Sequence, residues 1–214
     1  MQIAIGLYPG FAALDAIGPY QVFTCVPGVE VVLCAAERGL VPDDQNLLKV
    51  DVSSTFDEVT NPDVLLVPGG FITRRMAEQG DPIVEWIKAA HPTTTWTTSV
   101  CTGALLLGSA GLLDGLSATT HWCAYDHLRK YGAEPTEQRV VFEGKIVTAA
   151  GVSAGIDLAL TLVARTHGDE IAQAVQLGIE YDPQPPFDCG APSKAPAAIR
   201  DLVAAGTASA EADA

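Results

Sequence analysis

Cys101 has the local sequence of a nucleophile held between a strand and a helix. It follows an apolar, threonine-rich run and is followed directly by the small residues Thr102 and Gly103. A cysteine at a helix start lies near unpaired N–H groups and the positive end of the helix dipole, which favour thiolate over thiol. The pattern predicts a reactive thiolate with a depressed pKa, although a cysteine that is only a small buried apolar residue fits the same sequence.

Asp15 is the second candidate for chemistry. It lies in an otherwise apolar segment, residues 12–19, where a carboxylate costs free energy unless it is paired. Burial would raise its pKa and make it a proton donor near neutral pH. The alternative interpretation is an aspartate that caps a helix or stabilises a turn.

His121 could assist Cys101 only if the fold brought the two side chains together, and a hydrogen-bonded structural histidine is the favoured interpretation. The chain has five cysteines, an odd number at wide spacing without a CxxC pair. A disulfide framework and a common zinc site are therefore disfavoured, and a reducing cytoplasm is the expected location. Four cysteines are interpreted as structural: Cys25, Cys34, Cys123 and Cys189.

The elements that must position these residues alternate between strands and helices. Strands are expected at 3–7, 30–35, 63–67 and 93–100, with a strand pair at 138–142 and 145–149. Helices are expected at 11–25 (interrupted at Gly18-Pro19), 81–90, 102–110, 156–166, 169–179 and 196–204. Near-continuous apolar strands between helices predict an α/β fold with a mostly parallel sheet covered on both faces.

Three segments are expected to meet at the carboxyl ends of the strands, where open α/β sheets place reactive groups. They are residues 9–15, 68–70 and 99–103. We find no internal repeat and no linker, so the sequence predicts one domain over residues 1–205. Residues 206–214, rich in alanine, serine and acidic residues, are expected to form a frayed tail.

Composition excludes several classes of function. The chain of 214 residues is 48% hydrophobic and carries a formal net charge of -14, which disfavours nucleic acid and anionic membrane surfaces as partners. The apolar run at residues 100–113 is too short and too rich in glycine to span a bilayer. The first residues are typical of a strand rather than a signal peptide, so a soluble protein with a small-molecule substrate is expected.

Five motifs in order resemble the ThiJ/PfpI superfamily, which is class I glutamine amidotransferase-like. Within it, the sequence is most similar to the isocyanide (isonitrile) hydratases, from about residue 2 to about residue 193. The motifs are Asp15 with Gly18-Pro19, Pro68-Gly69-Gly70, Ser99-Val100-Cys101-Thr102-Gly103-Ala104, Ala118-Thr119-Thr120-His121-Trp122 and Gly151-Val152-Ser153-Ala154-Gly155-Ile156-Asp157.

The resemblance implies a flavodoxin-like three-layer sandwich with a nucleophile elbow, usually assembled as a homodimer. It implies that Cys101 is the nucleophile, that Asp15 is its acidic partner and that Thr102 lies against the nucleophile. Gly70 would supply a backbone amide, and Val152 would lie in a segment that packs near the cysteine.

The implied reaction is the hydration of an isocyanide. A thiolate attacks the isocyanide carbon, Asp15 protonates that carbon, and water converts the covalent thioimidate into an N-substituted formamide. This chemistry requires no metal or organic cofactor. Thr102 stands where PfpI-type peptidases carry histidine, which disfavours proteolysis, and the segment 71–75 is bulkier and more basic than in isocyanide hydratases.

Two other functions remain open at this point. A similar domain occurs as a ligand-sensing module fused to an AraC-type helix-turn-helix pair, and a sensor of small molecules or of redox state is one alternative. The sequence contains no basic DNA-reading region, which favours an enzyme. A glyoxalase-like or deglycase-like enzyme, which would also use Cys101 and an acid, is the other.

Overall fold

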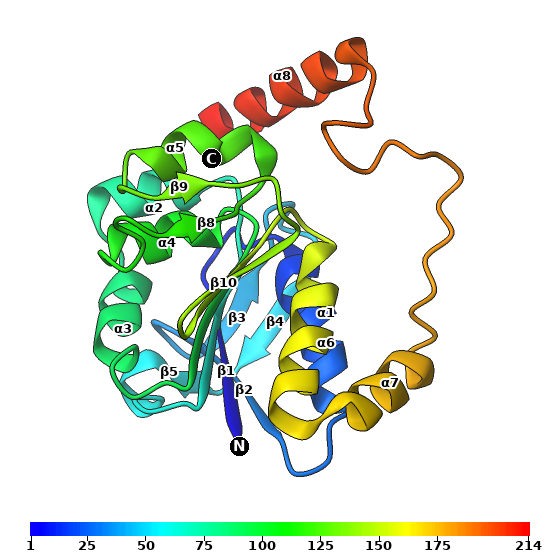
Figure 1. Ribbon diagram of the computed structural model, residues 1–214. Helices are drawn as coiled ribbons and strands as arrows, with labels where there is room; N and C mark the ends of the chain where they lie inside the picture. Colours follow the sequence, from blue (N-terminus) through cyan, green and yellow to red (C-terminus); the bar gives the residue numbers. More distant parts are fainter.

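The computed structural model describes the backbone of residues 1–214 and the side chains of all of them except Asp213. Its centre is a seven-stranded sheet with the order β10-β11-β7-β6-β1-β2-β5 (Figure 1). The pairs are parallel apart from the antiparallel edge pair β10–β11, which confirms the predicted mostly parallel α/β fold. Its strands are β1 (Gln2–Gly6), β2 (Glu30–Ala35), β5 (Ser54–Thr55), β6 (Val64–Val67), β7 (Trp96–Val100), β10 (Val140–Glu143) and β11 (Ile146–Ala149).

Helices cover both faces of the sheet. In Figure 1, α1 and α6 lie against one face, and α2, α3 and α4 lie against the other. The remaining elements are two small strand pairs, two 3₁₀ turns and three further helices. The helices are α1 (Ala13–Thr24), α2 (Thr73–Gln79), α3 (Pro82–Ala90), α4 (Gly103–Ser109), α5 (Tyr125–Arg129), α6 (Ala154–His167), α7 (Asp169–Gly178) and α8 (Ala197–Asp213), and the other elements are β3 (Gly39–Pro42) with β4 (Lys49–Val52), β8 (Ser117–Ala118) with β9 (Glu134–Pro135), η1 (Phe56–Glu58) and η2 (Trp122–Ala124).

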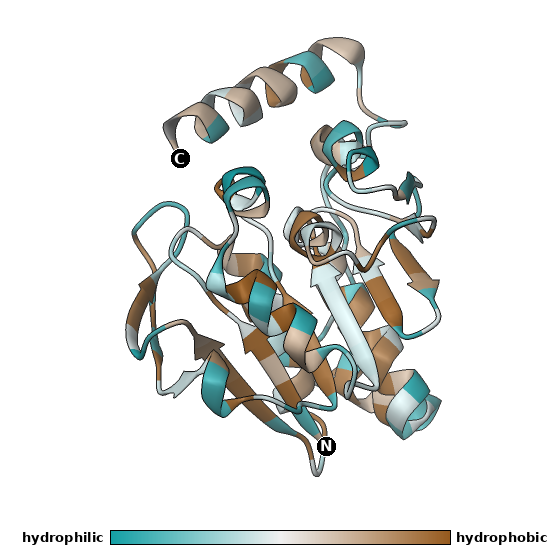
Figure 2. Cartoon of the chain, turned by 90° about the vertical axis from the view of Figure 1, so that its left-hand side faces the viewer, coloured by the Kyte–Doolittle hydropathy of each residue, from teal (hydrophilic) through white to brown (hydrophobic). Residues whose placement is uncertain are grey.

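The central strands are buried because they are apolar on both sides. Every residue of β6, Val64–Val67, is buried, and β1 is buried from Ile3 onward. Figure 2 shows the same pattern, with apolar residues concentrated in the strands and on the helix faces turned towards them. Among the described residues, no helix has both the length and the apolar character needed to cross a membrane.

Helix α1 is continuous, so the predicted interruption at Gly18-Pro19 is wrong. A proline inside a helix removes one hydrogen bond, but tertiary packing can offset that loss. A Cβ on Gly18 would lie 3.1 Å from Cγ1 of Ile156, and a Cβ on Gly155 would lie 3.0 Å from Cγ of Pro19. The small residues therefore let α1 and α6 pack closely, which keeps the helix intact through Pro19.

The C-terminal part of the chain differs from its prediction. The irregular segment 180–196 leaves the body of the molecule, and α8 then returns across the end of the sheet (Figure 1). The expected frayed tail is helical through Asp213, and the helix does not end near residue 204. Alanine has the highest helix propensity, and an ion pair between Arg74 and Glu211 ties this part of the helix to α2.

Candidate active site

Cys101 lies on a strained turn between β7 and α4. Its φ of +56° is in the left-handed region, which an ordinary side chain adopts only when its surroundings force it. The backbone N–H of Cys101 donates to the carbonyls of Ala149 at 3.0 Å and Ala150 at 3.2 Å. Its own carbonyl accepts a bond from Oγ1 of Thr120 at 2.8 Å. These bonds hold the predicted nucleophile elbow in place.

Glycines allow the segments around the elbow to approach one another. A Cβ on Gly103 would lie 2.3 Å from the carbonyl oxygen of Val67, so α4 can begin beside the end of β6 only with glycine there. A Cβ on Gly69 would lie 2.6 Å from the backbone nitrogen of Thr102 and 2.8 Å from Oδ2 of Asp15. The three predicted strand ends therefore do meet, and they meet at contact distance.

Asp15 is fully buried in the first turn of α1, where it is not the N-cap residue. Its Oδ2 accepts a hydrogen bond from the Gly69 N–H at 2.8 Å, whereas Oδ1 is buried without a hydrogen bond of ordinary geometry among the described residues. Burial raises the pKa of this carboxyl to about 7, against the opposing effects of the Gly69 amide and the Cys101 thiol. The predicted raised pKa is confirmed.

The thiol of Cys101 departs from its prediction. Burial raises the pKa of Cys101 above its ordinary value, and the Asp15 carboxylate raises it further, while the amide and hydroxyl of Thr102 lower it. The sequence indicated the helix start but not the burial, so the predicted depressed pKa is wrong for the resting site. At rest, the raised pKa keeps the thiol neutral, facing the carboxyl group of Asp15.

Thr102 and Gly70 form a fixed unit beside the sulfur. Oγ1 of Thr102 lies 3.0 Å from both the amide nitrogen and the carbonyl oxygen of Gly70, donating to the carbonyl and accepting from the amide. The backbone amide that the resemblance expects Gly70 to supply is thus engaged with Thr102. This pairing joins the ends of β6 and β7 beside the first turn of α1.

A cavity of about 140 Å³ opens onto Cys101. Val152 contributes to its wall, as the resemblance implied, and so does His121. Nδ1 of His121 accepts a long bond from the Cys123 N–H at 3.4 Å, and burial, followed by the charge of Arg74, lowers the pKa of the imidazole. The full lining is Ala12, Asp44, Gly70, Phe71, Cys101, Thr102, His121, Val152, Thr207 and Glu211.

Three of these lining residues were missed from the sequence. Asp44 comes from the loop between β3 and β4, and Thr207 and Glu211 come from α8. No local pattern marks them, because their position depends on how a hairpin loop and a terminal helix dock on the rest of the fold. A larger hollow of about 560 Å³, with Phe56 and Trp86 in its wall, has no cysteine or histidine in its lining.

All five cysteines are free. Within the part of the chain that the structure describes, no three His, Cys, Asp or Glu side chains gather in a group that could hold a metal ion. The chemistry available at this site is therefore that of a buried thiol, a carboxyl of raised pKa and a small cavity.

Comparison with known proteins identifies relatives of the whole arrangement. The model of the DJ-1/PfpI family matches residues 1–165. Isonitrile hydratase of Pseudomonas putida is 42% identical over 202 residues, which cover 94% of this chain and 87% of that protein. The deglycase PfpI of Pyrococcus furiosus is 30% identical over 142 residues, covering 65% of this chain and 83% of that protein.

The fold is also shared with a solved structure. A ThiJ/PfpI family protein from Pseudomonas syringae superposes with a TM-score of 0.90 at 38% identity, covering 99% of this chain and 89% of that chain. Since that similarity includes the mostly parallel sheet and its helical layers, the flavodoxin-like fold expected from the motifs is confirmed.

Proposed function

The chain belongs to the DJ-1/PfpI family, and on this premise we propose that it hydrates an isocyanide to an N-substituted formamide, with Cys101 as the nucleophile. The observation that carries the proposal is the buried Cys101–Asp15 pair, which opens onto a cavity of about 140 Å³. An isocyanide presents a terminal, unhindered carbon, so a narrow cavity admits it. Drug-sized ligands need about 300 Å³ or more.

The first step uses the proton held by the pair. Sulfur attacks the isocyanide carbon while the thiol proton moves to the Asp15 carboxylate, which removes the barrier posed by the raised pKa of the thiol. The negative charge left on the carbon then takes this proton from the Asp15 carboxyl. The result is a thioimidate, in which the sulfur and one hydrogen have added to the same carbon.

The second step consumes one water. Asp15, again a carboxylate, accepts a proton from the water as its oxygen adds to the thioimidate carbon. Protonation of the nitrogen and cleavage of the carbon–sulfur bond release the formamide, and the sulfur regains its proton. A carboxyl with a pKa of about 7 suits both roles, since neither protonation state is costly near neutral pH.

The remaining site residues position this pair. Thr102 and Gly70 hold each other through their two hydrogen bonds, and the Thr102 amide also stabilises negative charge on sulfur. Val152 and His121 limit the room for the substituent on the isocyanide nitrogen. The reaction needs no metal or organic cofactor.

Formation of formamide from a simple isocyanide tests the proposal. The wild type, incubated with cyclohexyl isocyanide, should release N-cyclohexylformamide, followed by chromatography. Cys101→Ala should give no product above background while circular dichroism stays unchanged, and mass spectrometry of Cys101 should trap the thioimidate in acid-quenched wild type. Product formation by Cys101→Ala would contradict the role of the sulfur.

A deglycase-like activity is the competing function, because the relative from Pyrococcus furiosus is named a deglycase. Consumption of methylglyoxal without isocyanide turnover would favour that alternative. Tight binding of small molecules without turnover of either would favour a sensor.

We further propose that the active form is a cytoplasmic homodimer. Support comes from the free state of all five cysteines, which suits a reducing compartment, and from the family resemblance. Light scattering coupled to size-exclusion chromatography should give a mass of twice the protomer, and a monomeric mass would contradict this.

A further inference from the structure

The wall of the Cys101 cavity includes a helix that the core of the fold does not supply. Thr207 and Glu211, one turn apart on α8, both line the cavity that opens onto the sulfur. Figure 1 shows α8 lying across the carboxyl ends of the strands, beyond the loops that surround the nucleophile. Access to the sulfur therefore depends on where α8 sits.

Helix α8 packs weakly against the rest of the fold. Its apolar side chains point largely to solvent, with Leu202 69% and Ile199 44% exposed, and none of its described residues is fully buried. A second hollow of about 320 Å³ lies under its end, between Phe71 and Ala210. An element with few buried apolar contacts opens at a small free-energy difference from the closed state.

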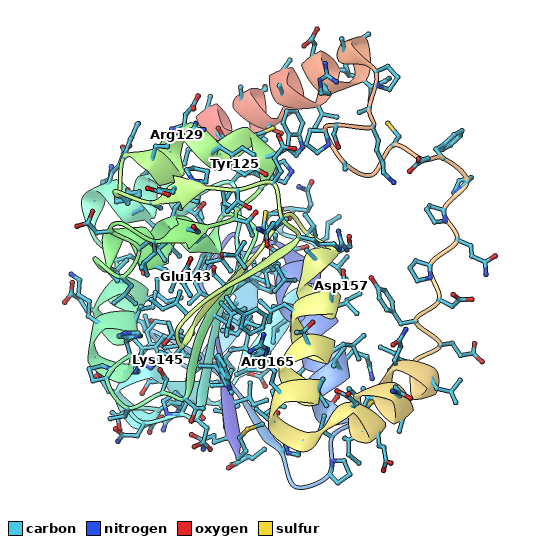
Figure 3. All side chains as sticks on the ribbon, viewed as in Figure 1. Tyr125, Arg129, Glu143, Lys145, Asp157 and Arg165 are labelled. Carbon is cyan, nitrogen blue, oxygen red and sulfur yellow. The ribbon has the colours of Figure 1, made fainter. Side chains whose placement is uncertain are left out.

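The chain that leads to α8 allows such movement. Residues 180–196 have no regular secondary structure and are mostly exposed. Figure 3 shows the first part of this segment standing away from the body of the molecule, whereas residues 190–193 line a hollow together with Trp122 and Tyr125. This segment holds to α6 near its start, where the Tyr181 hydroxyl donates to Oδ1 of Asp157 at 3.2 Å. The next contact with the body is at residues 190–193, which lie near Trp122 and not against the sheet, so α8 can leave the site without disturbing the strands.

Polar contacts hold the helix closed. The guanidinium of Arg74 on α2 forms an ion pair with Glu211, and the two side chains are only 14% and 21% exposed. Nη2 of Arg74 also donates to the Cys123 carbonyl at 3.1 Å, and the Thr207 hydroxyl hydrogen-bonds the thiol of the same cysteine. The basic segment 71–75 thus has a structural role, because its Arg74 forms the ion pair with α8.

We propose that α8 is a lid on the Cys101 cavity, latched by the Arg74–Glu211 ion pair, and that it sets the largest substituent the substrate can carry. The proposal rests on the proposed function for the identity of the substrate, but not for access to the sulfur. When the latch is closed, Thr207 and Glu211 limit the cavity to about 140 Å³. When it opens, bulkier groups reach Cys101.

Alkylation of Cys101 measures access without reference to turnover. Iodoacetamide and 2-iodo-N-phenylacetamide share one reactive group and differ in size, and peptide mass spectrometry isolates the signal of Cys101 from those of the other cysteines. Arg74→Gln and Glu211→Gln should each raise the ratio of the larger reagent's rate to the smaller one's by about threefold to tenfold. The charge-exchanged double variant R74E/E211R should restore the wild-type ratio.

The ratio of the two alkylation rates distinguishes the opening of a lid from a change in the charge around the thiol. Arg74 and Glu211 have opposite charges, so electrostatics alone would shift the thiolate population in opposite directions and change both reagents equally. Equal changes for both reagents, or opposite changes in the two variants, would overturn the proposal. Arg75→Gln, on the exposed side of the same helix, is the matched control and should leave the ratio unchanged.

A filling variant gives an independent test. Thr207→Phe lies on a half-exposed part of α8, so the core should fold normally, and it should lower the ratio below that of the wild type. The ratio of kcat/KM for tert-butyl or cyclohexyl isocyanide to kcat/KM for methyl isocyanide should rank the variants in the same order as the alkylation ratio. If alkylation shifts as expected while no isocyanide is hydrated, the lid stands and the proposed function fails. If Thr207→Phe leaves the ratio unchanged, the lid is wrong.

Discussion

The two sides of the Cys101 cavity are built in different ways. The inner side consists of strand ends and glycines packed at contact distance, with a strained backbone at Cys101 and a fully buried Asp15. The outer side is α8, whose apolar residues are largely exposed and which is held by polar contacts. The fold holds Cys101 and Asp15 rigidly, and on our proposal it leaves the outer boundary of the cavity adjustable. Changes on the inner side should therefore alter chemistry and stability far more than changes on the outer side.

The largest expected effect is on kcat, and it comes from replacing the Asp15 carboxyl on the inner side of the cavity. Asp15→Asn keeps the acceptor for the Gly69 amide but can neither take nor return the proton. General acid–base catalysis contributes about 10²–10⁴ in rate, so kcat should fall by about a thousandfold. Formamide release under saturating isocyanide measures this. A variant within tenfold of the wild type would show that the proton follows another route.

The pH dependence of stability should show the second effect. Folding raises the pKa of Asp15 from 3.8 to about 7, so between these values the folded state binds more protons than the unfolded state and loses stability as pH rises. The free energy of unfolding of wild type relative to Asp15→Asn should therefore fall by about 3 kcal/mol from pH 4 to pH 7 and level off above about pH 8. Urea unfolding at several pH values measures it, and a constant difference would mean that the carboxyl is not buried.

A methyl group at Gly69, one of the close contacts on the inner side, should have the third-largest effect. Gly69→Ala places a Cβ 2.6 Å from the Thr102 nitrogen, and overpacking of this kind costs about 1–3 kcal/mol. The free energy of unfolding should fall by that amount, with a loss of turnover as Thr102 and Asp15 move apart. Gly178→Ala, where a Cβ meets nothing within 4 Å, is the matched control.

The smallest effect should come from the outer side. Gly206→Ala in α8 adds a Cβ that meets nothing within 4 Å, and alanine is about 1 kcal/mol better than glycine inside a helix. Hydrogen exchange should slow about fivefold in the amides of α8 and stay unchanged in β6 and β7. Equal slowing in all three would show that α8 opens only with the whole fold.

The difference between the inner and outer sides of the cavity also explains which features could be predicted from the sequence. Strands such as β6 are apolar runs bounded by turn residues, so the fold class and the meeting of segments 9–15, 68–70 and 99–103 follow from local patterns. That Asp15 and Thr102 lie beside Cys101 was implied only by the family resemblance. Thr207 and Glu211 reach the cavity through a helix that docks after an irregular segment, and no local pattern encodes that docking. The raised pKa of Cys101 cannot be predicted from local sequence for a related reason, because the burial of the sulfur depends on all the segments that pack around it.

At residue 101, the stability of the fold and the proposed chemistry favour different amino acids. Glycine would occupy its positive φ without penalty, whereas a side chain in such a conformation costs of order 1–3 kcal/mol. A sequence shaped only for a robust fold would place glycine there. A cysteine at this position strains the backbone, and on the proposed function this strain holds the sulfur in the position from which it attacks the substrate.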